Sequence, residues 1–498
     1  MIEFKFDAEP LVNSRVKSLL VVHSYPNDLY LSWVLEYVNE IRSADKDIKI
    51  CIFDIGTYAW HKESHWKSKL RRFLHRTQNN SIKIFEHFSN ALSFDLEVKK
   101  RKILNELQLF IKFFFHAYTI NSVEELLSDS FYSKEHSWSV HSSLVNRYWS
   151  IFYIPKKHAF QVALRALSFK VSYMNTLDIL ITQKFDQVVV CNGRLPNSAG
   201  AAQAAKDKSI PVKFIERGGT PGMFNVFNIS PHSMRERFSN CVELWNSSVK
   251  NNRFFAETVA KSYINLRSNF DPIAGISWSR QMTSMDDLST LIPKTRKYMC
   301  VFYTSTEFEF AVYGDYVSPG QFRNQREALN ALLQCLSNEW QIIIRRHPQK
   351  LRRNWLKRDP EQTLWQGLES DPRIIIVQPE STINSYDLAL NADLVCHFNS
   401  SIGAEIMFLN SVPVISLGET YWDESPEFAL TNFEKLSNWL RKFSTKNQQE
   451  RALRWGLYSA IAGKPFKIIK WKNQRGFIFN QSLFSKELKK ELLSKKTK

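Results

Sequence analysis

Residues 374–418 decide the fold, and they read IIIVQPESTINSYDLALNADLVCHFNSSIGAEIMFLNSVPVISLG. Short apolar runs alternate in this stretch with segments whose apolar residues recur at helical spacing. The pattern predicts strand, helix, strand, helix, strand. Strands that alternate with helices are typical of a parallel α/β sheet.

The segment Asn399-Ser400-Ser401-Ile402-Gly403-Ala404-Glu405 lies where the apolar strand 394–398 ends and the next helix begins. Hydroxyls and free backbone N–H groups at a helix N-terminus make a site for an anion. We interpret it as the place where the phosphate of a nucleotide sits. The alternative is an ordinary capped helix, with Ser400 or Ser401 as its N-cap.

The composition allows a large globular protein with an anionic partner. The chain has 498 residues, enough for two or three domains, and 44% of them are hydrophobic. Lys and Arg number 67 against 49 Asp and Glu, a net charge of +18. That excess fits a nucleotide, phospholipid head groups, an acidic glycan or nucleic acid, and does not choose among them.

The cysteines and the N-terminus indicate the compartment. None of the six cysteines forms a CxxC pair, so we expect buried, reduced thiols rather than a zinc site. The start MIEFKFDAEP shows no signal peptide, and no apolar run approaches the roughly 20 residues that span a bilayer. We therefore expect a cytoplasmic protein, either free or peripheral on the inner face of the cytoplasmic membrane.

The first domain opens with the strands 18–23 and 48–53 around a helix, a βαβ unit that implies parallel strands. His23 and Asp54 fall at the carboxyl ends of these strands, where ligands of such sheets gather. Each is a candidate catalytic base, and each is equally readable as an ordinary polar residue at a strand end.

Residues 185–219 repeat the strand–helix–strand pattern, and the ends of their strands carry Asn192-Gly193-Arg194 and Glu216-Arg217-Gly218. Two consecutive strand ends would present these groups to one crevice. Arg and Glu at adjacent strand ends suit a hydroxyl-rich or phosphorylated ligand. A pair of salt-bridged loops is the alternative.

Residues 60–120 are basic and aromatic, and Val98-Lys99-Lys100-Arg101-Lys102 leads into an apolar helix. A core helix with a solvated basic start is one interpretation. A surface that docks on anionic lipid or on an acidic acceptor is the other.

The second domain begins with the strands 298–303 and 341–345. Three of its strand ends are expected on one rim of a doubly wound sheet: Ser305 with Glu307, Arg345 with His347 and Pro348, and the segment 399–405. His347 can donate to a phosphate oxygen, the serines can take the same phosphate, and Glu405 can accept from ribose hydroxyls.

The predicted division has three parts. Residues 1–285 form an acceptor-side Rossmann-like domain with a basic aromatic helical insertion, and residues 286–460 form a nucleotide-sugar-binding Rossmann-like domain. Residues 461–498 form a basic helical tail that packs back on the first domain. Residues 220–295 are expected to be irregular with helix-like stretches, and to contain the end of the first domain and a linker.

Several motifs are absent from the sequence. It has no DxD-type cluster at a strand end, no GxGxxG, no GxxxxGK[ST] and no G-x-S-x-G elbow. We therefore expect no metal and no cofactor.

The motifs of the second domain resemble those of a known family. His347-Pro348 and Ser400-Ser401 resemble the HP and SS motifs of GT-B glycosyltransferases of the capsule and surface-polysaccharide type, which include Kdo transferases and bacterial sialyltransferases that use CMP-sugars. The block from Ser400 through Glu405 to Gly418 is similar to the family's S-S-x-G-x-E-A…P-V-I-x-x-G block. The resemblance covers roughly residues 298–420, and the match in the first domain is shorter.

The resemblance implies an α/β, GT-B-like fold with two Rossmann-like doubly wound domains facing a cleft. It implies a nucleotide-sugar donor and a glycan or lipid-linked glycan acceptor, with an anionic membrane surface as a further partner. Pro413 stands where retaining enzymes have a second glutamate, which favours inversion, and no D/E-D-G match identifies the base. The donor site would comprise Ser305, Glu307, Arg345, His347, Pro348, Asn399, Ser400, Ser401, Gly403 and Glu405.

On the acceptor side the expected residues are Asn192, Arg194, Arg217 and Gly218, with Glu216, Asp54 and His23 as candidate bases in that order. The hypothesis is a metal-independent, inverting glycosyltransferase acting on a bacterial surface glycan such as capsule, O-antigen or lipopolysaccharide. A CDP-polyol glycerophosphotransferase of the teichoic-acid type is the rival enzyme. A basic nucleic-acid-binding protein is the rival outside enzymology, and it leaves the His-Pro and Ser-Ser strand ends unexplained.

Overall fold

A computed structural model describes residues 16–23, 28–55, 85, 89, 92–97, 103–148, 153–220, 222–269, 295–306, 322, 324–347, 362–381, 383–409, 411–422, 433–472 and 476–479. The chain divides into two compact units. Unit 1 comprises Met1–Leu144, Tyr153–Pro231 and Gly463–Lys498, and unit 2 comprises Val145–Phe152 and His232–Ala462.

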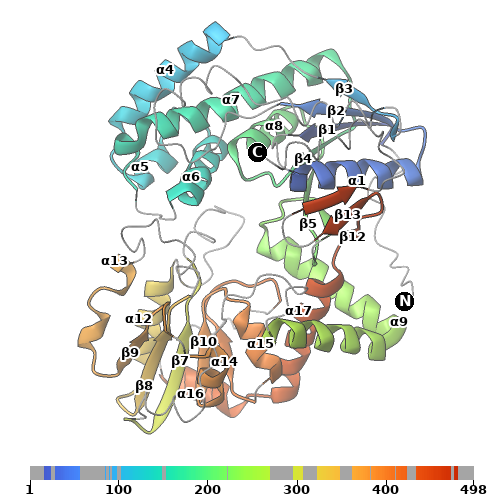
Figure 1. Ribbon diagram of the computed structural model, residues 1–498. Helices are drawn as coiled ribbons and strands as arrows, with labels where there is room; N and C mark the ends of the chain where they lie inside the picture. The colour runs from blue at the N-terminus through green and yellow to red at the C-terminus, as the bar shows by residue number, and fades with distance from the viewer. Residues whose placement is uncertain are drawn as a thin grey trace. The chain divides into compact units, whose positions relative to one another are not determined.

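Unit 1 is built on a seven-stranded sheet in the order β12-β6-β5-β4-β1-β2-β3 (Figure 1). Strands β1 to β5 are parallel, and β6 and β12 extend the sheet beyond β5 by antiparallel pairing. The strands are β1 Ser18–His23, β2 Lys49–Asp54, β3 Asp95–Glu97, β4 Gln187–Cys191, β5 Val212–Arg217, β6 Met223–Phe227 and β12 Lys464–Pro465.

Both faces of this sheet are buried, which explains why its strands are apolar without a break. Leu19 and Val21 of β1 point into one core with α1 Asp28–Ala44, while Leu20 and Val22 point into a second core on the other face. That second core includes residues of α7 Ala159–Thr182 and α8 Pro196–Asp207. Continuous burial on both faces is expected of a parallel sheet covered by helices on each side.

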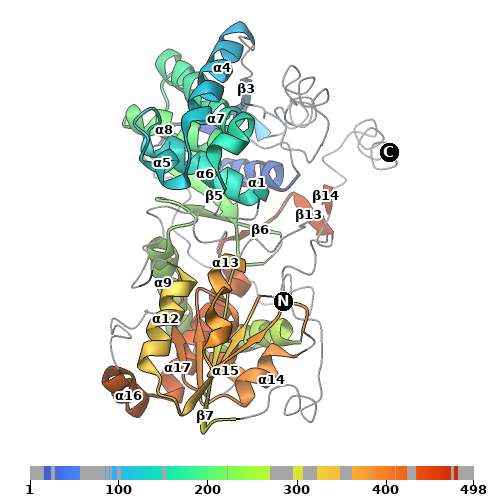
Figure 2. The ribbon, with the colours of Figure 1, turned by 90° about the vertical axis from the view of Figure 1, so that its left-hand side faces the viewer.

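A layer of helices extends unit 1 beyond the sheet. Helix α7 packs on α8, and α4 packs on α7. Figures 1 and 2 show α4 at the outer edge of the unit. The layer consists of α4 Ile103–Thr119, α5 Val123–Ser128, α6 Lys134–Tyr148, whose last residues fall in unit 2, and the 3₁₀ turn η1 Pro155–His158.

Unit 2 is built on a five-stranded, all-parallel sheet in the order β11-β10-β7-β8-β9. Its strands are β7 Tyr298–Tyr303, β8 Trp340–Arg345, β9 Ile374–Val377, β10 Leu394–His397 and β11 Val414–Ser416. Alternate residues again feed two cores: Val301 faces one, and Cys300 and Phe302 face the other. The covering helices are α9 Met234–Ser268, α12 Gln325–Cys335, α13 Gln362–Trp365, α14 Ser385–Leu390, α15 Ile402–Leu409, α16 Phe433–Arg441 and α17 Thr445–Ile461.

The predicted fold class is confirmed: the chain folds into two Rossmann-like, doubly wound α/β units. In each unit the chain builds the sheet outward on one side of its first strand and then returns to build the other side. The order therefore reverses between β1 and β4 in unit 1 and between β7 and β10 in unit 2. Ligands of open α/β sheets bind beyond the carboxyl ends of the strands at such switch points.

The secondary structure differs from expectation in two places. Residues 220–295, expected to be irregular with helix-like stretches, contain strand β6 and the 35-residue helix α9, which is kinked at Asn252. Helix α9 belongs to unit 2, whose longer segment, His232–Ala462, therefore includes residues that were expected in the first domain. The stretch that follows α17, expected to be helical, forms β12 and a hairpin of β13 Ile469–Lys472 and β14 Gly476–Phe479.

The start of this C-terminal stretch is held against α1 of unit 1. The buried carboxylate of Glu36 accepts backbone N–H bonds from Lys467, Ile468 and Ile469 at 2.6 to 2.8 Å. Burial raises the pKa of Glu36, and the three N–H donors oppose that shift. Residues 480–498 lie outside the described part.

All six cysteines are buried and free, as expected of reduced thiols. No helix among the described residues is long and apolar enough to cross a membrane.

Candidate functional site

The three strand ends that the sequence places on one rim of unit 2 are neighbours in the structure. Strand β7 lies between β8 and β10, and all three run parallel, so their carboxyl ends meet at one edge. The backbone N–H of His347, after β8, donates to Thr304 Oγ1, after β7, at 2.9 Å. The N–H of Phe398, after β10, donates to the carbonyl of Tyr303 at 3.3 Å.

Buried hydroxyls without partners among the described residues mark this edge. Ser305 Oγ and Thr306 Oγ1 make no hydrogen bond to that part of the chain, although each residue is only 4% exposed. The backbone of Ser305 is fixed by Gln325, which accepts its N–H at 2.8 Å and donates to its carbonyl at 3.1 Å. A buried polar group left unpaired costs free energy, so such groups at a switch point indicate a ligand that pairs them.

Asn399 adds a third unpaired polar atom from the other side of the switch point. It is 8% exposed, its Oδ1 has no partner, and its backbone is left-handed with φ of 53°. Asn is one of the few residues that tolerate this conformation. The left-handed backbone and the unpaired amide oxygen thus lie two residues after the end of β10.

His347 lies at this edge as a neutral imidazole. Burial, and after it the Arg345 guanidinium, lower the pKa of His347 from 6.5 to about 4. At neutral pH the ring therefore has one N–H to donate and carries no charge. Glu307 and Pro348, the other predicted members of these two strand ends, lie outside the described residues.

The Ser-Ser turn is held from behind by His397, a residue that the sequence analysis missed. His397 Nδ1 accepts the backbone N–H of Ser400 at 3.3 Å, so this N–H is not available to a phosphate as expected. Burial, and after it Arg451, lower the pKa of His397 to about 3, which keeps the ring neutral. Gly403 has to be glycine, because a side chain there would collide with the same imidazole.

Glu405 is engaged in a buried network. It is 3% exposed, and its Oε1 accepts from Arg267 of α9 at 3.1 and 3.2 Å, while its Oε2 accepts from the hydroxyl of Tyr386. Arg267 also reaches Ser401 Oγ at 3.4 Å. Burial alone would lower the pKa of Arg267, but the Glu405 carboxylate outweighs it, and the pKa lies above its ordinary value.

This network places a cation beside the start of helix α15, directly at the Ser-Ser turn. Both carboxylate oxygens of Glu405 are already occupied, so ribose binding by Glu405 stays a prediction that requires one of these bonds to be exchanged. Neither Arg267 nor Tyr386 was found from the sequence, because their partners lie 138 and 19 residues away along the chain.

Arg345 is also occupied within the protein. It is 3% exposed and donates to the carbonyl of Gln378 at 2.7 Å and to the carbonyls of Ser381 and Ile383 at 3.4 Å. These contacts hold the connection between β9 and α14. Its direct contact with a donor nucleotide stays a prediction.

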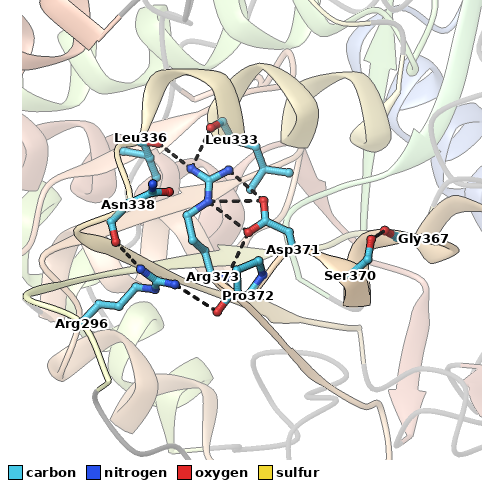
Figure 3. A network of polar contacts seen from close by, with 9 residues as sticks. All are labelled: Arg296, Leu333, Leu336, Asn338, Gly367, Ser370, Asp371, Pro372 and Arg373. Carbon is cyan, nitrogen blue, oxygen red and sulfur yellow. Dashed lines mark hydrogen bonds and ion pairs between the residues drawn. The ribbon is translucent and has the colours of Figure 1, made fainter.

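The opposite edge of the same sheet is closed by internal contacts (Figure 3). Arg373 donates to the carbonyls of Leu333 and Leu336 at 3.0 and 2.6 Å, which caps the C-terminal end of α12, and pairs with Asp371 at 2.8 Å. The Arg373 side chain lowers the pKa of Asp371 through this hydrogen bond. The groups drawn in Figure 3 have partners, in contrast to the hydroxyls at the carboxyl edge.

At the switch point of unit 1, His23 and Asp54 are directly opposite each other on β1 and β2. His23 Nδ1 lies 3.6 Å from Asp54 Oδ1, and both side chains are 1% exposed. Within the described ranges neither ring nitrogen of His23 has a hydrogen-bond partner, and the ring packs edge-on against Phe85 at 5.0 Å. An imidazole beside a buried carboxylate is an arrangement that can accept a proton.

The neighbouring strand ends, after β4 and within β5, are also in contact as expected. Asn192 Nδ2 donates to Glu216 Oε2 at 2.5 Å, and Asn192 Oδ1 accepts the N–H of Arg194 at 3.2 Å. Glu216 Oε1 accepts the N–H of Arg217 at 3.1 Å. Glu216 is therefore held by two hydrogen bonds, in the part of β5 that pairs with β6.

The backbone at this turn is left-handed at two successive residues, with φ of 64° at Asn192 and 75° at Gly193. A side chain at Gly193 would collide with the ring of Phe214. Arg217 is exposed, and Gly218 N–H closes the turn into β6 by donating to the carbonyl of Met223 at 3.1 Å. Acceptor binding by Asn192, Arg194, Arg217 and Gly218 stays a prediction.

Comparison with solved structures returns proteins that handle nucleotide-sugars or transfer sugars. The UDP-GlcNAc 2-epimerase from Methanocaldococcus jannaschii, in complex with UDP-GlcNAc and UDP, is 13% identical over 88% of this chain and 98% of its own, with a TM-score of 0.25. A glycosyltransferase from Rickettsia africae is 10% identical over 90% of this chain and 95% of its own, with a TM-score of 0.27.

A spinosyn rhamnosyltransferase is 10% identical over 89% of this chain and 96% of its own, with a TM-score of 0.23. No protein-family model matches the chain, and no curated protein matches it either. Identities and TM-scores this low carry no argument about substrate or reaction, so function has to be inferred from the geometry of the described residues.

Proposed function

We propose that this chain is a glycosyltransferase of the GT-B type that moves a sugar from a nucleotide-sugar donor to a bacterial surface glycan. The observation that carries the proposal is the pair of unpartnered, buried hydroxyls of Ser305 and Thr306 at the switch point of unit 2. Hydroxyl donors at that position suit phosphate oxygens. The similarity of His347-Pro348 and Ser400-Ser401 to HP and SS motifs makes a CMP-linked donor the first choice.

In this proposal unit 2 binds the donor phosphate with neutral groups. Ser305, Thr306 and the neutral imidazole of His347 donate hydrogen bonds to it. The side-chain hydroxyl of Ser400 and the N-terminal end of α15 act on the same phosphate. Arg267, held beside Ser401 by Glu405, supplies positive charge where the leaving phosphate gains negative charge.

Unit 1 supplies the base. The sequence ranks Glu216 before Asp54 and His23, but both oxygens of Glu216 are already bonded, whereas both ring nitrogens of His23 are unpaired. We therefore place His23 first, with Asp54 as the group that orients it and stabilises its protonated form. His23 takes the proton of the acceptor hydroxyl as that oxygen attacks the anomeric carbon. The bond from this carbon to the phosphate oxygen breaks, and the nucleotide leaves with the electron pair. The configuration at the anomeric carbon is inverted.

A panel of CMP, CDP, UDP and GDP in a thermal-shift assay of the full chain tests the donor site. A selective rise of the melting temperature with CMP supports a CMP-sugar donor. A preference for UDP or GDP changes the donor and keeps the class. No response to any nucleotide overturns the proposal. Because the same phosphate site would serve a CDP-polyol donor, product analysis for a glycosidic bond or a phosphodiester decides the type of transfer.

A further inference from the structure

One face of helix α4 carries a row of exposed apolar side chains that the proposed transferase site does not use. Its members are Leu104, Leu107, Ile111, Phe115 and Tyr118, which are between 41% and 76% exposed. Their spacing of three or four residues places them on one side of the helix over four turns, roughly 20 Å. We call these five residues the α4 stripe.

The α4 stripe is not part of the core of unit 1. The opposite side of α4 is already buried, with Phe113 5% exposed and Ala117 fully enclosed. Phe110 packs edge-on against Phe160 of α7 at 5.3 Å. Figures 1 and 2 show α4 at the outer edge of the unit, and the exposure of the stripe places it on the side of α4 opposite Phe113 and Ala117. A contiguous exposed apolar patch of this length marks an interaction surface.

Positive charge borders the α4 stripe. Lys112 of α4 and Lys156 and Lys157 of η1 are exposed, and the Lys156 amine lies 5.4 Å from the centre of the Tyr118 ring. The one carboxylate of α4, Glu106, is 5% exposed and so leaves the exposed face without negative charge. Long apolar and aromatic side chains beside lysines, on a chain of net charge +18, match the boundary between acyl chains and anionic head groups.

We propose that the α4 stripe, with Lys112, Lys156 and Lys157, docks the protein on a bilayer surface that contains anionic phospholipid. Helix α4 lies in the plane of the surface, with its Leu, Ile and Phe side chains at the acyl boundary and the lysine amines at the head groups. The role that we give to this docking, bringing unit 1 to a lipid-linked acceptor, rests on the proposed function. The binding itself requires neither donor nor acceptor.

Vesicle co-sedimentation of the full chain tests the docking. We expect binding to vesicles in which about a third of the phosphatidylcholine is replaced by phosphatidylglycerol, and little binding to phosphatidylcholine alone. The Leu107→Ser/Phe115→Ser variant should bind at least about tenfold more weakly, because it removes two apolar side chains from the contact. Lys156→Glu/Lys157→Glu should weaken binding to the anionic vesicles and leave the residual binding to neutral vesicles unchanged.

Matched controls test whether the loss of binding is specific to the α4 stripe or follows from any loss of apolar surface or positive charge. The apolar control is Phe254→Ser, at a residue of α9 that is 82% exposed. The charge control is Lys206→Glu/Lys250→Glu, at two exposed lysines outside the stripe. Both controls should bind vesicles like the wild type. Equal loss in the controls overturns the docking surface, as does vesicle binding that is unchanged in the stripe variants.

A second copy of the chain is the competing occupant of the α4 stripe. If light scattering finds a dimer that the Leu107→Ser/Phe115→Ser variant converts to a monomer while vesicle binding persists, the membrane proposal is overturned. The response of each variant to CMP is measured in parallel. A variant that no longer binds vesicles but keeps its thermal shift with CMP shows that membrane docking and donor binding depend on different residues.

Discussion

The two sheets have the same order of five parallel strands and different chemistry at the point where that order reverses. Unit 1 runs β3-β2-β1-β4-β5 and unit 2 runs β9-β8-β7-β10-β11. In both, the strand that begins the return is followed by an Asn in the left-handed conformation, Asn192 and Asn399. Beyond that, unit 1 presents an imidazole and two carboxyl side chains, those of His23, Asp54 and Glu216, whereas unit 2 presents the hydroxyls of Ser305 and Thr306 and two neutral imidazoles, His347 and His397.

This difference separates two tasks that the same fold can serve. A proton can be moved by an imidazole beside a carboxylate, and a phosphate is held well by neutral donors near a fixed cation. A neutral site costs less to bury in the empty state than a charged one, because isolated charges are expensive to desolvate. The expected division is therefore that changes in unit 1 alter turnover and changes in unit 2 alter nucleotide affinity.

The largest effect is expected from His23→Gln. Loss of the proposed base should lower kcat by about 10²- to 10⁴-fold, with the CMP-induced thermal shift unchanged because the proposed donor site lies in unit 2. Release of nucleotide from the donor in the presence of acceptor is the measurement.

Two variants calibrate that result. Asp54→Asn should lower kcat less than His23→Gln, because Asp54 acts through the imidazole. Glu216 is the rival candidate for the base. If Glu216→Gln abolishes turnover and His23→Gln does not, Glu216 and not His23 is the base.

Arg267→Met should have the next largest effect, on stability. Removing the guanidinium leaves the carboxylate of Glu405, 3% exposed, without its charged partner, and breaking such a buried pair costs about 3–5 kcal/mol. Urea unfolding measures the loss. The double variant Arg267→Met/Glu405→Gln should recover much of it, and equal instability of the single and double variants would mean that packing of α9, and not the ion pair, is at stake.

A smaller effect, with opposite signs in two assays, is expected from Ser305→Ala/Thr306→Val. Nucleotide affinity should fall by about 10- to 100-fold, since hydrogen bonds to a charged phosphate are lost. The melting temperature of the free protein should stay the same or rise, because two buried hydroxyls without partners are removed. Ser370→Ala, which removes a hydroxyl at the opposite edge of the sheet, is the matched control and should leave affinity unchanged.

The sequence was sufficient for the parallel strands other than β3 and for the three strand ends of unit 2, whereas the order of the strands and β6, β12, β13 and β14 were seen only in the structure. It was sufficient because a parallel sheet buried on both faces needs continuous apolar runs, and the residues that follow each run must lie at one edge. It was not sufficient for Arg267, whose partner Glu405 lies 138 residues away, or for the length of helix α9 and its place in unit 2. His397 was missed because a histidine inside an apolar strand gives no sign of which backbone N–H it accepts.

The smallest expected effect concerns His347. It decides whether this imidazole stays neutral when a nucleotide is bound as well as in the free protein. Its pKa of about 4 lies below the ordinary value of 6.5, so the folded protein holds the neutral form and gains the proton only as pH falls toward 4. Affinity for the methyl ester of CMP, whose phosphodiester keeps a single charge, should therefore vary less than about threefold between about pH 5.5 and pH 8. Isothermal titration of the wild type and of His347→Gln over this range measures it. Binding that strengthens tenfold on acidification in the wild type alone would show that His347 holds the phosphate as a cation, and unit 2 would no longer differ from unit 1 in binding its ligand with neutral groups.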